Sequence, residues 1–444
     1  MLSLRRVTSV AGVLAVLWLP SIATAEPPNR AAVEAWLAST PAQLPAAGSV
    51  LRQADVASLR ALLAPGYLDD ANYPETIFTI EASGDYPPPP IFQAATAANA
   101  GKTTLLPAGG VANYTAGQPF DTAQFDDVSP TDAGLMAAWN HVYRWQYYGY
   151  RVKALDMVNV QPTAGDKPGQ RAGGMEGGGT AERALVQFFH RVYLSHLAML
   201  PTHDYRVNAS DSQHRYFKDY ISFLEPFDVA GTTFVVERAL DANEEDQVNT
   251  YLPSQRRVRR VSAKERADNF MGSNYTLDDF EGFSGRVMDY QWTYRGQKQV
   301  LHVSNSQEKT LRFGGPHSNI AIDRWQVRNC FVVELTPHWK GHPMATKYLL
   351  IDEQTWAPAV ALIIDRKDQL WRVLMTHYQR PIPDASTPAR ALETSLGGWR
   401  GSVSLDLGNN STTIARATTP SEFPTMSDRE IERTFSLSRL TEGR

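Results

Sequence analysis

Asp278 and Asp279 are the two residues whose adjacency could perform acid–base chemistry. Neighbouring carboxylates can push their pKa values apart, so that one acts as a general acid while the other stays ionised. With a histidine such as His317, the pair would make a hydrolase site. Consecutive side chains diverge in a strand or loop, however, and the same residues suit a turn or the start of a helix. The sequence favours this structural role and keeps the hydrolase as an alternative.

The histidines offer a second possible chemistry, which is metal binding. His338 and His342 have the spacing of two ligands on one helix face, but Pro337, Gly341 and Pro343 make this segment a turn. The sequence contains no HExxH zinc motif, no GxSxG nucleophile motif, no phosphate-binding loop and no GxGxxG fingerprint. We therefore predict no metal, no cofactor and no enzymatic activity.

A dense basic run stands at residues 256–260, which read RRVRR. Such a run could bind nucleic acid through its phosphates. The formal net charge of the chain is −4, and Glu244, Glu245 and Asp246 lie nearby in the sequence. This acidic balance gives no reason to expect a nucleic-acid partner, and ion pairing within the protein is the favoured interpretation.

The first 25 residues have the pattern of a cleavable signal peptide. Arg5 and Arg6 precede an apolar core at residues 10–19, and Ala23 and Ala25 provide the small residues that a signal peptidase requires. The core is too short to span a membrane, which takes ~20 residues. We expect cleavage after Ala25 and export to a bacterial periplasm.

Cys330 is the only cysteine of the chain. A single cysteine excludes an intramolecular disulfide, and Cys330 does not stand directly after the signal core, so lipidation of the mature N-terminus is not expected. Cys330 stands in an apolar run, where a buried and unreactive thiol is the expected state. The mature protein should therefore diffuse freely.

The elements that must position these residues change in type along the chain. Residues 26–140 read as short helices and loops, with apolar spacing near 3.6 at 30–37 and 53–63 and a helix start before 133–141. From residue 215 onward, strand-like runs recur with short polar turns between them. These runs are 232–238, 247–252, 256–261, 289–294, 299–304, 327–335, 347–351, 360–364 and 370–377.

The turns and the apolar pattern of these runs indicate an antiparallel meander. Short turns such as 295–298 and 365–368 connect antiparallel neighbours, since a parallel pair needs a crossover of a dozen or more residues. Runs 327–335 and 360–364 carry apolar side chains on both faces, whereas a sheet with one solvated face would alternate. Either the N-terminal helices or a bound apolar ligand must cover the second face. The segment 184–200 suits a helix or a strand equally.

Three ordered segments between residues 223 and 280 resemble exported proteins of the outer-membrane lipoprotein-sorting-like superfamily. Residues 223–232 read FLEPFDVAGT, similar to an F-x-x-P-x-D-x-x-G-T segment. Residues 249–261 read NTYLPSQRRVRRV and look like a Y-L-P-x-x-R-x-V-R-R hairpin. Residues 270–280 read FMGSNYTLDDF and are similar to an F-x-G-S block followed by an aspartate.

Further segments resemble a narrower proteobacterial family of unknown function. They include 94–96, 113–120, 325–334 and 350–356, so that the resemblance covers residues 65–380. It implies an α+β fold of the LolA/LolB type, which is a large, incomplete antiparallel β-barrel capped by helices. The expected division is a signal peptide (1–25), an N-terminal helical and loop segment packing on the sheet (26–140), a LolA-like β-barrel domain (141–380) and a C-terminal extension, partly strand and partly tail (381–444).

The resemblance also implies a function. Proteins of this type are thought to shelter acyl chains in the half-barrel and to ferry lipids or lipid-anchored proteins across the periplasm. We therefore expect a non-enzymatic carrier of a lipid or other apolar ligand. The resemblance further suggests an inner-membrane exporter of the resistance-nodulation-division type and outer-membrane components as partners. The chain is much longer than the best-known lipoprotein carriers, so their particular cargo is not carried over.

An envelope structural or interaction protein, with a sheet filled by its own side chains, is the alternative of a different class. For the carrier, the largest inward-facing side chains of the predicted strands should contact the ligand. The residues expected to line its cavity are Phe234, Tyr251, Trp292, Phe331, Val333, Leu349, Ile351, Ile363, Trp371 and Val373.

Overall fold

The structure is a computed structural model that describes residues 26–162, 171–262, 264–380 and 398–442. The predicted signal peptide therefore lies outside the described residues. The strands are β1 (Val50–Arg52), β2 (Ile77–Ile80), β3 (Thr104–Leu105), β4 (Val111–Ala112), β5 (Gly149–Gln161), β6 (Thr180–Tyr193), β7 (Arg215–Glu225), β8 (Thr233–Ala239), β9 (Gln247–Leu252), β10 (Arg257–Val261), β11 (Tyr290–His302), β12 (Phe313–Gly314), β13 (Ile320–Ala321), β14 (Arg324–Pro337), β15 (Met344–Asp352), β16 (Pro358–Asp365), β17 (Leu370–Gln379), β18 (Gly398–Asp406) and β19 (Ser411–Ala417).

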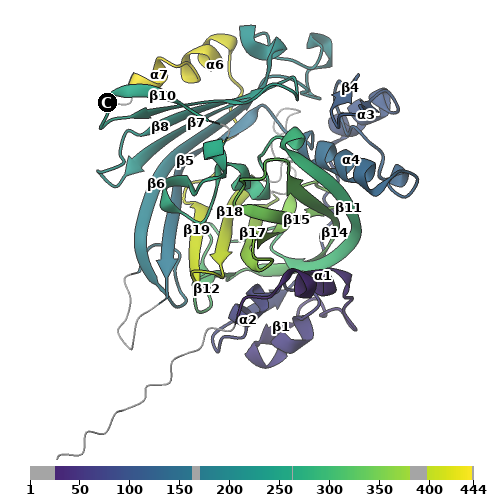
Figure 1. The fold of residues 1–444 in the computed structure, drawn as a ribbon, viewed down its shortest axis with the longest axis vertical. Coiled ribbons are helices and arrows are strands. Elements are labelled where there is room, and N and C mark those ends of the chain that lie inside the picture. The colour runs from purple at the N-terminus through teal and green to yellow at the C-terminus, as the bar shows by residue number, and fades with distance from the viewer. Residues whose placement is uncertain (1–25, 163–170, 263, 381–397, 443–444) are drawn as a thin grey trace, which may run out of the picture.

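Most of these strands belong to one large, curved sheet (Figure 1). Its order is β1-β2-β14-β15-β16-β17-β18-β19-β5-β6-β7-β8-β9-β10, and β11 pairs with β14 outside this path. Neighbours are antiparallel except for β2 and β14, which run parallel. Among the described strands, the two ends of this order do not pair with each other. The predicted α+β fold with a large, incomplete antiparallel barrel is therefore confirmed.

Short helices lie on both sides of the sheet. The α-helices are α1 (Arg30–Ala38), α2 (Tyr67–Ala71), α3 (Pro90–Asn99), α4 (Pro130–Val142), α6 (Asp428–Thr434) and α7 (Arg439–Glu442). The 3-10 helices are η1 (Gln53–Leu59), η2 (Thr122–Gln124), η3 (Pro201–His203), η4 (Ser210–Gln213), η5 (Lys264–Ala267), η6 (Phe270–Gly272), η7 (Leu277–Gly282) and η8 (Val287–Asp289). No helix in the described ranges is long and apolar enough to cross a membrane.

Local signals placed several elements correctly. The predicted start before residue 133 is the N-terminus of α4, where the Ser129 side chain accepts from the Asp132 backbone and Pro130 opens the first turn. The run 247–252 is β9, and the ambiguous segment 184–200 falls largely in β6. Periodicity succeeded here because these elements bury one face each.

β11 differs from the prediction of two strands joined by a turn at 295–298. It is one strand with a bulge between Tyr294 and Gln297, and Gly296 has φ +90° there. Glycine adopts this left-handed conformation without strain. Pairing with β14 continues on both sides of the bulge, with Trp292 opposite Leu335 and Leu301 opposite Val327. The long partner strand keeps β11 continuous through a sequence that alone favours a turn.

The meander is interrupted between β10 and β11. β10 lies at one end of the strand order, whereas β11, the next strand in sequence, pairs with β14 near the other end. The connection is the segment 264–289, which contains η5 to η8 and which we call the crossover. Its length allows the chain to pass over one face of the sheet instead of turning back beside β10.

The C-terminal strands complete the middle of the sheet. β18 pairs with β17, and β19 pairs with β5, so these two strands join β14 to β17 and β5 to β10 into one continuous sheet. The segment after residue 380 was expected to be partly strand, and its strands β18 and β19 belong to this sheet.

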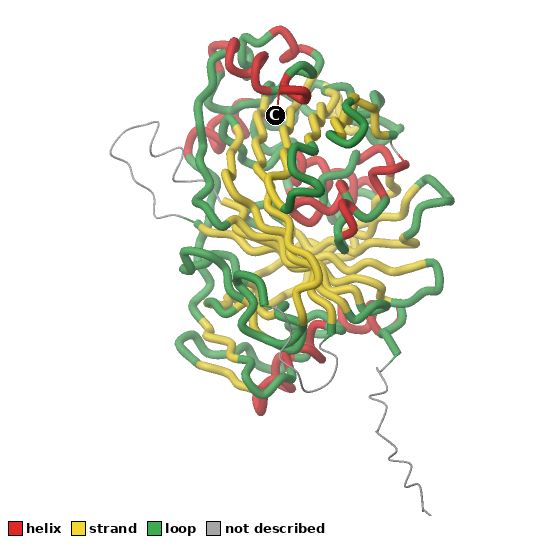
Figure 2. The backbone as a smooth tube through the Cα atoms, turned by 90° about the vertical axis from the view of Figure 1, so that its left-hand side faces the viewer, coloured by secondary structure: helices red, strands yellow, loops and turns green. Residues whose placement is uncertain are grey.

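Protein elements cover both faces of the sheet (Figure 2). One face packs with the N-terminal residues Val33, Leu62 and Phe78 into a core that includes Val332 and Leu350. The opposite face packs under α4 and the crossover, in a core that includes Ala137, Phe283, Phe331, Val333 and Leu349. This arrangement explains the strands that are apolar on both faces, because neighbouring residues of one strand enter different cores.

Burial holds several histidines in the neutral form. Loss of hydration lowers the pKa of His190, His196 and His302 to about 4, whereas a histidine in an unfolded chain titrates near ~6.5. Because each folded pKa is lower, the unfolded state binds more protons below pH ~6.5. The stability that these groups contribute is present above that pH and is lost as the pH falls towards 4. We expect the urea midpoint to decrease steadily over this interval.

His190→Phe should reduce this acid loss. The His190 ring is 3% exposed, lies 5.1 Å from the Phe435 ring, and has no hydrogen-bond partner at Nε2 in the described part of the chain. Phenylalanine keeps the packing and removes the proton site. The control is exposed His203→Gln, which should leave the slope unchanged. Equal slopes for wild type and His190→Phe in urea titrations between pH 7 and 4.5 would contradict this account.

Candidate ligand-binding cavity

The crossover is fastened to the sheet by buried ion pairs. Asp279 and the Lys347 ammonium of β15 are 2.8 Å apart. Arg266 lies 2.7 Å from Asp278 within the crossover and 3.5 Å from Asp246 just before β9. Charged groups withdrawn from water are costly to separate, so these contacts hold the segment firmly over the sheet.

Glu281 provides a third attachment of the crossover. It accepts a hydrogen bond from the Tyr150 hydroxyl at 2.5 Å and forms an ion pair with Arg144. Glu281 is 7% exposed and Tyr150 is 8% exposed, so these contacts are inside the protein. The crossover is thus pinned to β5 as well as to β15.

A cavity lies between the crossover and the strands beneath it. It contains about 770 Å³ of space between atoms, counting the part open to solvent. We call it the apolar cavity. Its apolar wall comes from the sheet residues Leu155, Met157, Phe189, Phe217, Ile221, Val236 and Ala415 and from the crossover residues Phe270, Tyr275, Leu277 and Phe280.

Charged side chains also reach this wall, but each has a partner. Arg191 donates two hydrogen bonds of 2.6 Å to Asp219, and its guanidinium carbon lies 4.1 Å from the centre of the Phe217 ring. Burial by itself would raise the pKa of Asp279, but the neighbouring Lys347 ammonium outweighs it and holds that pKa below its usual value. The wall is therefore apolar with internally neutralised charges.

A second cavity adjoins the first. It contains about 840 Å³ of space, again counting the part open to solvent, and Glu281 and Trp399 line both cavities. We call it the aromatic cavity. Its aromatic wall residues are Tyr86, Phe92, Trp145, Tyr147, Tyr150, Trp356, Tyr378, Trp399 and Phe423, and its polar ones include Gln118, Arg144, Gln354, Thr355, Arg380 and Ser421.

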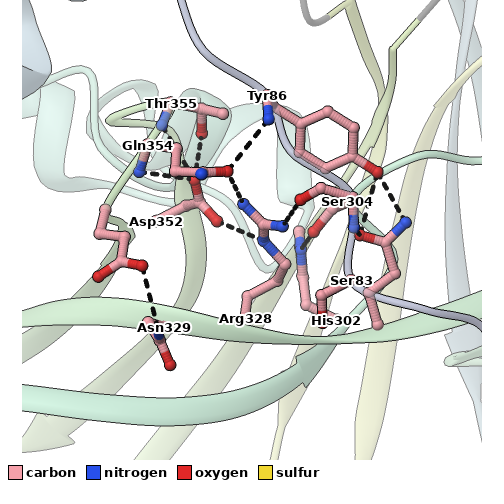
Figure 3. A network of polar contacts seen from close by, with 12 residues as sticks. Ser83, Tyr86, His302, Ser304, Arg328, Asn329, Asp352, Gln354 and Thr355 are labelled. Atoms are coloured by element: carbon pink, nitrogen blue, oxygen red, sulfur yellow. Dashed lines mark hydrogen bonds and ion pairs between the residues drawn. The ribbon is translucent and has the colours of Figure 1, made fainter. Parts of the chain in front are cut away.

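A polar network fixes one side of the aromatic cavity (Figure 3). Arg328 donates to Asp352 at 2.7 Å and to the Gln354 side chain at 2.9 Å. Gln354 in turn accepts from the Tyr86 backbone at 3.1 Å, and Thr355 donates to Asp352 at 2.9 Å. Residues from the segment before α3 and from the β15–β16 turn are thereby held together at one wall.

The ten residues predicted to contact a ligand are placed elsewhere. None of them lines the apolar or the aromatic cavity. Most lie under α4 and the loops beside it, where side chains of the protein fill the space. Phe331, for example, stacks on Trp356 with ring centres 5.0 Å apart. Eight of the ten belong to this contiguous core, which extends to Phe234 and Tyr251; the six on the α4 side are Trp292, Phe331, Val333, Leu349, Ile351 and Ile363.

The remaining four are distributed over both faces. Phe234 lies next to the apolar cavity, because its ring is 5.4 Å from that of the lining residue Phe270. Tyr251 pairs with Thr233, whose hydroxyl donates to Leu440 of α7, and directly paired residues share a face. Val373 belongs to the core beneath the N-terminal helices, and Trp371 is half-buried with its indole N–H bonded to Asp406.

The structure does not bring the residues of the alternative hydrolase site together. Asp278 accepts from Arg266 and from the Tyr290 hydroxyl, and Asp279 pairs with Lys347. His317 bonds to Asp70 of α2 at 2.8 Å, in the N-terminal covering layer. The two aspartates have the structural role that the sequence favoured, since Thr276 and Asp279 cap the first turn of η7.

The histidines at 338 and 342 also occupy a turn. His342 Nδ1 accepts from the Met344 backbone at 3.2 Å. Across the described ranges, no group of three or more His, Cys, Asp or Glu side chains is arranged to hold a metal ion. Cys330 is buried, and burial raises the pKa of its thiol well above the ordinary value.

Comparison with known families identifies the chain. Residues 54–440 match the family described as "Protein of unknown function (DUF1329)". This chain belongs to the DUF1329 family. The predicted membership of a family of unknown function is therefore confirmed. An uncharacterized protein of Pseudomonas aeruginosa is 26% identical to this DUF1329 protein over 320 residues, which are 69% of this chain and 63% of that relative.

Two solved structures are also similar to this DUF1329 protein. A DUF1329 family protein from Desulfovibrio piger is 16% identical and covers 70% of this chain and 100% of its own, with a TM-score of 0.45. A LolA superfamily protein from Nitrosomonas europaea is 10% identical, with the same coverages and a TM-score of 0.37.

The sequence did not predict the cavity residues of this DUF1329 protein, because the strands that carry them are distant in sequence and meet only in the folded protein. β5, β6 and β7 come before the meander that dominates the sequence pattern, and β18 and β19 come after it. One local signal existed, since Leu155 and Met157 are spaced two apart, as are Phe217 and Asp219. That spacing shows which residues share a face, but it does not show that the crossover covers them.

Proposed function

We propose that this DUF1329 protein is a non-enzymatic carrier that shelters a lipid or other apolar ligand in the apolar cavity. The observation that supports the proposal is the apolar space between the crossover and the strands β5 to β8, β18 and β19. Each methylene moved out of water contributes about 0.8 kcal/mol, so ~10 methylenes of an acyl chain would supply several kcal/mol. Binding alone, with no chemical step, is sufficient for transport.

The place of action in this proposal is the periplasm. The signal-peptide pattern of residues 1–25 supports export, and the absence of a cysteine directly after it agrees with a mature chain that is not lipidated. A carrier of this kind would move its ligand between envelope membranes or to an inner-membrane exporter of the resistance-nodulation-division type. Outer-membrane components would then be the other partners.

Filling the cavity tests the proposal. Ala415 on β19 is 9% exposed, lies opposite Met157 and lines the apolar cavity. We expect Ala415→Phe to reduce the amount of co-purifying lipid about 10-fold or more, because the new ring occupies the space of the chain. Lipid mass spectrometry on protein purified from its native compartment measures the effect, and thermal unfolding verifies the fold.

Ala184→Phe is the matched control, because Ala184 lies on β6 of the same sheet but is exposed. It should retain as much lipid as the wild type. If wild-type protein carries no apolar ligand and takes up none when supplied, the carrier proposal is wrong. An envelope structural protein whose sheet serves only its own packing would give that result.

A further inference from the structure

The two adjoining cavities differ in their balance of charge. In the apolar cavity, Arg191 is paired with Asp219, Arg266 with Asp278, and Asp279 with Lys347. Glu281, at the border of the two cavities, is paired with Arg144. Among the residues that the structure describes, a charged ligand group placed in the apolar cavity would find no counter-ion that is not already used, so that space suits an uncharged chain.

Arg380 lines the aromatic cavity and is a cation without a carboxylate partner in the described part of the chain. Among the described residues, no carboxylate oxygen lies within 4 Å of the Arg380 guanidinium, and its Nε is buried without a hydrogen-bond partner. Its central carbon lies 5.1 Å from the ring centre of Tyr86 and 5.6 Å from that of Tyr378. Asp352, the acid nearest in effect, already binds Arg328 at 2.7 Å.

Other donors in the same wall are also unused. The Trp145 indole nitrogen and the Ser421 hydroxyl are buried and have no hydrogen-bond partner in the part of the chain that the structure describes. A buried donor left unpaired is costly, so such groups usually meet an acceptor from water or from a ligand. Burial also lowers the pKa of Arg380, which reflects the cost of a desolvated cation. All three groups call for an acceptor, and Arg380 calls for a negative one.

We infer that the aromatic cavity is a head-group site for an anionic amphiphile, with the carboxylate or phosphate at Arg380 and the alkyl chain reaching the apolar cavity beside Glu281 and Trp399. The inference rests on the proposed carrier function and adds the chemical class of the ligand. Guanidinium groups bind both carboxylates and phosphates through paired N–H donors, and stacking on tyrosine rings pre-orients them. The adjoining uncharged space then provides the binding energy of the chain.

The test compares amphiphiles with the same chain. Dodecyl phosphate and dodecanol are titrated into the full-length mature protein by calorimetry, and inorganic phosphate is titrated separately. We expect dodecyl phosphate to bind about 10-fold or more tightly than dodecanol, and inorganic phosphate to bind far more weakly than either. Arg380→Gln should weaken dodecyl phosphate to the level of dodecanol and leave dodecanol unchanged. Arg380→Lys should keep most of the advantage.

The control variant is Arg183→Gln, because Arg183 is 40% exposed and pairs with Asp228 away from both cavities. It should bind all probes as the wild type does. Equal affinity of the wild type for dodecyl phosphate and dodecanol, or an undiminished advantage in Arg380→Gln, would overturn the head-group site while the carrier function stands. Inorganic phosphate binding as tightly as dodecyl phosphate would instead indicate a free-anion site and also overturn the inference. Failure of every amphiphile to bind would remove the carrier function itself.

Discussion

Lys347→Met is expected to lower the free energy of unfolding by about 3–5 kcal/mol. The Lys347 side chain is 2% exposed and that of Asp279 is 6% exposed, and their 2.8 Å contact joins β15 to the crossover. Removing the ammonium leaves a buried carboxylate without its counter-ion. Denaturation in urea at pH 7, followed by circular dichroism, measures the loss.

A double variant tests whether the loss comes from the unpaired charge. Lys347→Met combined with Asp279→Leu removes both charges and should recover much of the lost stability, because an apolar pair needs no counter-ion. The surface pair Arg183–Asp228 provides the comparison, since breaking an exposed ion pair costs about 1 kcal/mol or less. If Lys347→Met costs no more than breaking this exposed pair, the Lys347–Asp279 pair does not hold the crossover.

The same pair should have a characteristic pH dependence. The pKa of Asp279 is held below its usual value in the folded protein. Its contribution to stability is therefore present above the unfolded pKa, ~3.9, and is lost as the pH falls through the folded pKa. The stability difference between wild type and Lys347→Met should shrink below pH ~4. A difference that stays constant into strong acid would argue against an ionised Asp279.

Trp292→Ala is expected to cost a similar amount, about 3–5 kcal/mol. The Trp292 side chain is 1% exposed, and its indole N–H donates to the Val287 carbonyl at 2.9 Å. The Phe283 ring packs edge-on against it, with ring centres 5.1 Å apart. Alanine would leave a void in the core below α4, and urea denaturation would report it.

This variant also distinguishes a core residue from a ligand contact. The folded fraction of Trp292→Ala should keep the wild-type affinity for dodecanol, because Trp292 lines neither cavity. Phe227→Ala is the control, because it also removes an aromatic ring but Phe227 is 96% exposed. The free energy of unfolding of this variant should change little. A Trp292→Ala protein that keeps the wild-type free energy of unfolding but no longer binds dodecanol would favour the ligand role predicted from the sequence.

The order of strands shows the limit of local patterns. Residues 247–252 were predicted as a strand and form β9, because alternation and short turns act between neighbours in the chain. The pairing of β11 with β14 and of β19 with β5 joins residues far apart in sequence. No single-sequence pattern encodes such partners, since each strand offers the same backbone hydrogen bonds to any neighbour.

The candidate site shows the same limit more strongly. Phe331 and Val333 were chosen as ligand contacts because they are large, apolar and spaced two apart, but those properties are equally those of a filled core. The cavity forms at Phe189, Ile221 and Ala415, where the crossover passes above the strands without filling the space.

The sequence by itself determined the export pattern, the family, the strand-rich α+β class and the structural role of Asp278 and Asp279. These properties depend on local composition, on spacing and on short motifs. Only the tertiary structure decided which elements cover each face of the sheet, and that Arg380 has no carboxylate partner among the described residues. Those outcomes depend on which distant segments meet, and the free energy of burial that selects them is a property of the whole packed chain.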